Sequence, residues 1–257
     1  MLILDEYERR ARLVPGLLAI LPFIVLFAVL GLRQISAISY VFGALALAGV
    51  GPVLIAGVVR NFGKAAERRL WNGWGGPPTT RWLRLDPPSD NEVQHNMWRK
   101  AVEAVSGVPL PSLRAERRNV TKADSVIETA VKRVRRKADK EKFNLLFIEN
   151  RNYGYERNIY GLRWAARGVS LASAFVMIVY IAWLAPLMNR PQVSAANLAG
   201  LALCLICFFG WFVLPSEERV KEAADRYANE LLHAAVTLQE ELEAPGQVQV
   251  LRLEGEM

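Results

Sequence analysis

Four long segments without a charged residue constrain this chain more than any other feature. They cover residues 13–32, 34–59, 168–189 and 191–216 and contain 20, 26, 22 and 26 residues. A helix needs about 20 mainly apolar residues to cross the hydrocarbon core of a bilayer, so each segment is long enough. Inside lipid the backbone has no water to bond, which makes helix the expected form. The sequence therefore predicts a mainly α, polytopic membrane protein with four transmembrane helices in two hairpins.

The positions of the basic residues predict how these helices are oriented. Only Arg33 and Arg190 lie in the short links inside the two hairpins, and all other Lys and Arg residues lie on the opposite side. By the positive-inside rule, both termini and the central region are cytoplasmic. We expect the first segment to be retained as an anchor, because it is longer than the apolar part of a signal peptide. The predicted order is a cytoplasmic N-terminus (1–12), transmembrane hairpin 1 (13–59), a basic cytoplasmic ligand-binding domain (60–167), transmembrane hairpin 2 (168–215) and a cytoplasmic helical tail (216–257).

The region between the hairpins is strongly basic. Residues 60–167 hold 23 of the 32 Lys and Arg residues but 12 of the 25 Asp and Glu residues, a balance of +11. Within them, apolar residues from Ala123 to Ala138 recur at helical spacing, and the other face carries the basic run KRVRRKADKEK (132–142). Such a face is most often solvated or near anionic lipid. The same face can bind nucleic acid, where neutralised phosphates make affinity fall steeply with salt. We predict an inserted, mostly helical domain.

The segment WNGWGGPPTTRWLRLDPP, residues 71–88, is rich in helix-breaking residues. Its four Pro and three Gly predict a shaped loop rather than a helix or strand. Trp71, Trp74 and Trp82 alternate in it with Arg81 and Arg84. Two interpretations stay open. The tryptophans either lie at the membrane interface, or they form a site where bases stack on indole rings while Arg binds phosphate.

Residues 143–164 lead directly into the third uncharged segment. Their first part, 143–148, is an apolar run that fits either a strand or a buried helix. Arg151 and Arg157 then alternate with tyrosines that include Tyr153. A ligand bound here would be placed to move the third transmembrane helix.

The sequence lacks the motifs of common catalytic sites. It has no P-loop, no GxSxG, no HExxH and no paired-carboxylate arrangement. Two His and two Cys are too few for most metal sites or for a disulfide framework, and Cys204 and Cys207 lie in an apolar run where packing is the expected role. The four uncharged segments contain no Asp, Glu, Lys, Arg or His, which argues against an ion-coupled transporter. We predict a protein that is not an enzyme and uses no cofactor or metal.

Two signatures between the hairpins carry a family resemblance. WNGWGGPPTTRWLR (71–84) and FNLLFIENRNYGYERNIYGL (143–162) resemble bacterial four-span membrane proteins encoded beside nucleotidyltransferases, in particular the membrane effector of the Hailong antiphage defence system. The resemblance implies a homo-oligomeric ion channel of the bacterial inner membrane, acting in antiviral defence by abortive infection. It also implies that single-stranded DNA oligomers made by the partner nucleotidyltransferase bind the cytoplasmic domain and keep the pore shut.

The candidate ligand-binding residues are chosen from charge and aromatic content. We expect four arginines to hold phosphates, two more to lie near the gate, and three tryptophans to stack on bases or brace the loop. The full predicted set is Arg68, Trp71, Trp74, Arg81, Trp82, Arg84, Arg133, Arg136, Lys137, Arg151, Tyr153 and Arg157. The alternative hypothesis is a membrane-anchored scaffold that contacts acidic lipid or recruits a protein partner and conducts nothing.

Overall fold

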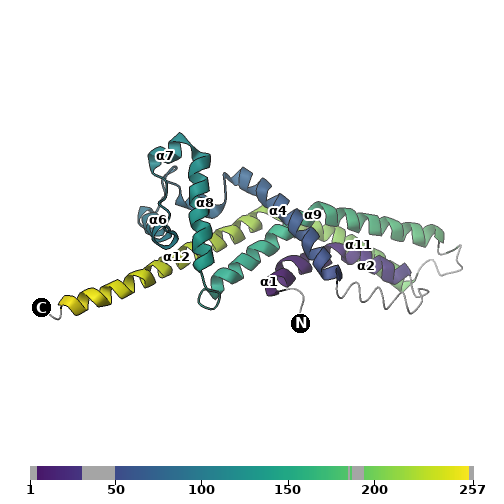
Figure 1. Ribbon diagram of the computed structural model, residues 1–257. Helices are drawn as coiled ribbons and strands as arrows, with labels where there is room; N and C mark the ends of the chain where they lie inside the picture. Colours follow the sequence, from purple (N-terminus) through teal and green to yellow (C-terminus); the bar gives the residue numbers. More distant parts are fainter. Residues whose placement is uncertain (1–4, 31–49, 185, 187–193, 255–257) are drawn as a thin grey trace. The chain divides into compact units, whose positions relative to one another are not determined.

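The computed structural model describes residues 5–30, 50–184, 186 and 194–254 of the 257-residue chain (Figure 1). The described residues form helices joined by short turns, with no strand among them. The prediction of a mainly helical protein is therefore confirmed. The chain divides into two compact units: the first unit contains Met1–Leu70 and Arg151–Val220, and the second unit contains Trp71–Asn150 and Lys221–Met257.

Three helical stretches in the described ranges are long and apolar enough to cross a membrane. They are Glu6–Val29, Asn144–Trp183 and Ala195–Val213. These stretches overlap the first, third and fourth segments predicted from the sequence. Most of the second predicted segment, 34–59, lies outside the described residues, and its last part begins helix α4 (Val50–Trp74). The membrane span predicted for residues 34–59 and the orientation of the termini stay predictions.

The first unit is built from α1 (Glu6–Glu8), the π-helix η1 (Arg9–Leu13), α2 (Val14–Leu30), most of α4, the greater part of α9 (Asn144–Val179), the π-helix η3 (Tyr180–Leu184) and α11 (Ala195–Val213). Its buried core includes Ala19, Val59, Leu162, Ala166 and Trp211. The outward faces of the apolar helices remain uncovered, and the side chains of Phe23, Phe175 and Phe209 are 48%, 65% and 64% exposed. Such faces fit a lipid environment or a neighbouring subunit.

Helices α4 and α9 approach so closely that glycine is required on both. A Cβ atom at Gly161 would lie 2.7 Å from the backbone oxygen of Phe62 and 2.9 Å from the backbone nitrogen of Gly63. A Cβ atom at Gly63 would overlap the side chain of Asn158. Small residues permit this backbone contact, as they do where membrane helices pack tightly.

The second unit packs short helices around a compact core. It contains α5 (Pro78–Leu83), α6 (Glu92–Ser106), α7 (Leu113–Arg118), α8 (Val120–Lys137), the first residues of α9 and most of α12 (Glu217–Glu254). The periodic face predicted for 123–138 is buried, because Ile127, Ala130 and Val134 are at most 1% exposed. Leu231 and Leu232 of α12 enter the same core, so the tail packs on this unit.

The structure corrects one local prediction, defines the start of α8 and decides between two alternatives that the sequence left open. The segment 71–88 is partly helical, since α4 continues to Trp74 and α5 begins at Pro78, where a proline fits the first turn of a helix. Helix α8 begins after Asn119, whose side chain accepts from the Lys122 amide at 2.9 Å. The ambiguous run 143–148 is helix from Asn144 onward, because α9 starts there.

Candidate nucleic-acid interface

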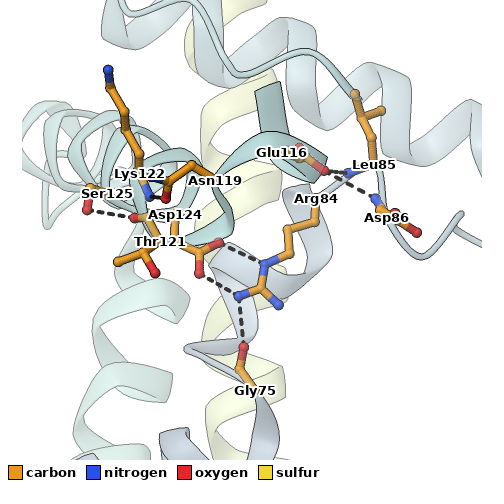
Figure 2. A network of polar contacts seen from close by, with 10 residues as sticks. All are labelled: Gly75, Arg84, Leu85, Asp86, Glu116, Asn119, Thr121, Lys122, Asp124 and Ser125. Carbon is orange, nitrogen blue, oxygen red and sulfur yellow. Dashed lines mark hydrogen bonds and ion pairs between the residues drawn. The ribbon is translucent and has the colours of Figure 1, made fainter. Parts of the chain in front are cut away.

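Arg84 is held in a network of polar contacts rather than displayed to solvent (Figure 2). Its Nε and Nη2 atoms donate to the two carboxylate oxygens of Asp124 at 2.8 and 2.6 Å, and Nη2 also donates to the carbonyl of Gly75 at 2.8 Å. This bidentate ion pair raises the pKa of Arg84 above its usual value, mainly through the hydrogen bonds to Asp124. Arg84 therefore joins the turn after α4 to α8, which leaves it less able to bind a phosphate.

A buried carboxylate organises the turn that follows. Glu116 is 3% exposed, and its Oε2 atom accepts from the backbone amides of Leu85 and Asp86 at 2.8 and 3.2 Å (Figure 2). On its other side the Nη1 atom of Arg99 lies 3.6 Å from Oε1, and Arg99 also donates to the carbonyl of Pro111 at 2.6 Å. These contacts fix the loop between α5 and α6, because backbone amides there would otherwise lack partners.

The basic face of α8 has a structural role. Lys137 donates through Nζ to the carbonyl of Val105 at 2.7 Å, and Arg133 donates to the carbonyl of Ser106 at 3.2 Å. These carbonyls belong to the last turn of α6, which Gly107 ends at φ 65°. Cations are favourable at a helix C-terminus, where carbonyls lack intrahelical donors. Arg133 and Lys137 are thus caps of α6, although both remain exposed, as Arg136 does.

Trp82 lies in an acidic environment. Its ring stacks on Trp98, with centroids 5.7 Å apart and planes 9° apart. It lines a pocket of about 590 Å³ that contains one cation, Arg226, and four carboxylates, which belong to Glu149, Glu222, Asp225 and Glu230. Burial raises the pKa of Asp225, because removing a carboxylate from water disfavours its charged form. Carboxylates repel phosphates, so this wall is unsuited to stacking a nucleotide.

The other predicted residues of the Trp-rich segment are partly covered. Trp71 and Trp74 are half-buried, and the indole N–H of Trp71 has no hydrogen-bond acceptor in the described part of the chain. Arg81 is half-buried and within electrostatic reach of Asp225. Arg68 is exposed on α4, in the first unit. Arg68 therefore belongs to the first unit, whereas Trp71, Trp74 and Arg81 belong to the second.

The predicted residues of α9 belong to a buried polar cluster in the first unit. Glu67 accepts from Tyr153 Oη at 2.9 Å and from Arg157 Nη1 at 2.8 Å. Arg157 is 7% exposed, and its guanidinium lies 5.6 Å from the centre of the Tyr153 ring. Arg151 forms an ion pair with Glu6. These contacts tie α9 to α4 and to the N-terminal turn, so their evident role is to hold the unit together.

The second unit also contains a basic groove that the sequence did not predict. It has a volume of about 740 Å³, within the range of about 300–1,000 Å³ typical of ligand pockets. Arg114 and Arg118 of α7 and Lys122 of α8 line it, all three exposed, and no Asp or Glu is among its described lining residues. The Lys122 side chain extends away from the Arg84–Asp124 pair (Figure 2). The sequence shows these cations close together in the run LRAERRNVTK (113–122). It does not show that the folded chain places them along one groove.

Comparison of the chain with protein-family models, with curated proteins and with solved structures finds no match in any of the three. A function for this chain is therefore inferred from the geometry described above and from the sequence resemblance.

Proposed function

We propose that this chain is the subunit of an oligomeric membrane channel whose helical domain binds single-stranded DNA oligomers that hold the pore closed. The observation that supports this most directly is the groove lined by Arg114, Arg118 and Lys122, because three cations on a concave surface suit a phosphate chain. Helices apolar enough to span a bilayer supply the membrane part. The channel activity, the DNA ligand and the direction of gating come from the resemblance to the Hailong-type effector.

The groove favours contacts to phosphate over contacts to bases. Its described lining residues include no aromatic side chain, and its remaining surface is formed by small or weakly polar groups such as Ala115, Ala123 and Val126. Phosphate contacts position a nucleic acid but carry no sequence information. We therefore expect little base preference and strong dependence on salt, with the tryptophans of the 71–88 segment in a structural role.

Binding of a fluorescent oligodeoxyadenylate to the full-length protein in detergent, measured across a salt series, tests this proposal. The groove variant carries Arg114→Gln, Arg118→Gln and Lys122→Gln. For single strands the salt slope changes by about 0.7 per neutralised phosphate, so losing three contacts should lower it by about 2. A matched variant on the exposed face of α8 and the turn after it carries Lys132→Gln, Arg136→Gln and Lys140→Gln and removes the same charge.

The expected result is weakened binding in the groove variant and near-normal binding in the matched variant. The reverse pattern would move the ligand to the face predicted from the sequence. Oligomer binding that ignores salt, or none at all to the wild-type protein, would refute the proposal.

Ion flux from liposomes that contain the purified protein tests conduction. We expect flux without the oligomer and its suppression when the oligomer is added on the side of the helical domain. A protein that binds the oligomer but conducts nothing would instead support the membrane-anchored scaffold.

A further inference from the structure

Two arginines of α9 are stacked on aromatic rings where the uncharged part of that helix begins. The guanidinium of Arg163 lies 3.7 Å from the centre of the Tyr160 ring, and that of Arg167 lies 3.9 Å from the centre of the Phe212 ring. The centre of the Trp164 ring is 6.0 Å from the Arg163 guanidinium and 4.5 Å from that of Arg167. All of these residues belong to the first unit, so the cluster is defined within one compact body.

Hydrogen bonds to the backbone fix the positions of both guanidinium groups. Arg163 donates to the carbonyl of Tyr160 at 2.6 Å. Arg167 donates through Nε and Nη2 to the carbonyl of Trp211 at 3.1 and 2.9 Å. A guanidinium carries five N–H donors, more than these bonds use. Two cations four residues apart on one helix are therefore held in place with donors to spare.

The cluster lies at the boundary of the apolar helices. The third uncharged segment begins at Gly168, directly after Arg167, and α11 ends at Val213, directly after Phe212. The contact of Arg167 with Trp211 and Phe212 thus brings the start of one uncharged segment to the end of another candidate membrane span. Lipid headgroups occupy this level, and amphipathic aromatic rings are enriched there.

The exposure of the aromatic residues indicates that the cluster faces outward. Trp164 is 65% exposed and Phe212 is 53% exposed, while both arginines are half-buried. A buried structural cluster would hide its largest apolar rings. Rings that remain uncovered beside fixed cations instead match a lipid, whose acyl chains contact the rings and whose phosphate contacts the guanidinium groups.

From this geometry we infer that Arg163, Trp164 and Arg167 form a binding site for the phosphate of an anionic phospholipid. The two guanidinium groups hold the headgroup phosphate, and the Trp164 ring packs beside its glycerol and first acyl carbons. This inference goes beyond the proposed function, since it holds whether or not the protein conducts ions or binds DNA.

The test measures lipid binding to the full-length protein in a zwitterionic detergent by native mass spectrometry. Phosphatidylglycerol is titrated against wild-type protein, against the double variant Arg163→Gln with Arg167→Gln, and against the matched double variant Arg60→Gln with Lys64→Gln. Arg60 and Lys64 are exposed cations just beyond the second uncharged segment, so they lose the same charge on the same predicted side. Phosphatidylcholine and inorganic phosphate serve as comparison ligands.

We expect the wild-type protein and the Arg60/Lys64 variant to prefer phosphatidylglycerol to phosphatidylcholine. The Arg163/Arg167 variant should bind phosphatidylglycerol roughly 25-fold more weakly, which corresponds to about 1 kcal/mol for each cation. Wild-type affinity in that variant, or an equal loss in the Arg60/Lys64 variant, would overturn the assignment. Displacement of the lipid by an equal concentration of inorganic phosphate would show a soluble-anion site and would also overturn it.

A second measurement covers the case in which the Arg163/Arg167 variant does not fold. A photoreactive phosphatidylglycerol is crosslinked to wild-type protein in liposomes, and the labelled peptides are identified. Labelling concentrated on the α9 peptide that contains Trp164 is the expected result. Labelling confined to other peptides would contradict the site.

Discussion

The close contact of α4 and α9 predicts that a single methyl group destabilises the first unit. In Gly161→Ala the new Cβ atom would lie 2.7 Å from the backbone oxygen of Phe62 and 2.8 Å from its carbonyl carbon. No rotamer change can relieve a clash with backbone, so the helices must separate by several tenths of an ångström. Overpacking of this kind costs about 1–3 kcal/mol. The higher helix propensity of alanine offsets about 1 kcal/mol of this destabilisation.

A glycine elsewhere on the same helix provides the matched control. A Cβ atom added to Gly168 of α9 would meet no described neighbour within 4 Å, so Gly168→Ala gains the propensity without the clash. The difference between the two variants therefore isolates the overpacking of about 1–3 kcal/mol. At about 2–4 °C for each kcal/mol, Gly161→Ala should melt about 2–12 °C below Gly168→Ala.

Circular dichroism at 222 nm, followed during heating of both variants in the same detergent, measures this difference. Equal melting temperatures for the two variants would refute the close contact of α4 and α9. A higher melting temperature for Gly161→Ala would do so more strongly, because it would mean that the methyl group fills open space.

Three further predictions concern the second unit. Burial, and then the positive charge of Arg99, lower the pKa of His95, so the folded chain keeps this side chain neutral while the unfolded chain binds a proton below pH about 6.5. Stability should thus fall on acidification from pH 7 to 5, and His95→Gln should flatten this dependence; parallel curves of melting temperature against pH would contradict it. Arg84→Lys should cost about 1–2 kcal/mol in urea unfolding, because lysine cannot replace the bidentate contact with Asp124, and unchanged stability would show that the pair is not needed. Asp225→Asn should raise stability at pH 7 by up to about 1 kcal/mol, because it removes a buried charge. The gain should be smaller near pH 4.5, since burial raises the pKa of Asp225 and the carboxyl is then partly protonated in the folded chain. An equal gain at both pH values would exclude this cause.

The helical framework could be predicted because its signals are local. Uncharged runs of at least 20 residues identify candidate spans without knowledge of any contact, and three such runs coincide with helices of the described chain. The buried face of α8 follows from the spacing of Ile127, Ala130 and Val134. The glycine that ends α6 has a positive φ, as its position after a periodic run indicates.

The candidate site could not be predicted to the same extent, because sequence shows which residues are charged but not which of them are already paired. Asp124 is 40 positions from Arg84, and no sequence pattern near either residue indicates their contact. In the sequence, Arg133 and Lys137 resemble part of a ligand-binding face. In the structure, they donate to carbonyls at the end of α6. The cations of the groove were not predicted, because α7 and α8 bring Arg114 and Lys122 to one concave surface only in the folded chain.

An anionic ligand on the basic face of α8 would compete with the end of α6 for Arg133 and Lys137. A polyanion that captured Arg133 and Lys137 would withdraw donors from the carbonyls of Ser106 and Val105. The final turn of the helix would then fray, and the backbone amides near Gly107 would exchange with deuterium faster in the bound state than in the free one. Binding in the groove would leave those amides protected, so hydrogen exchange distinguishes the two locations without altering a single residue.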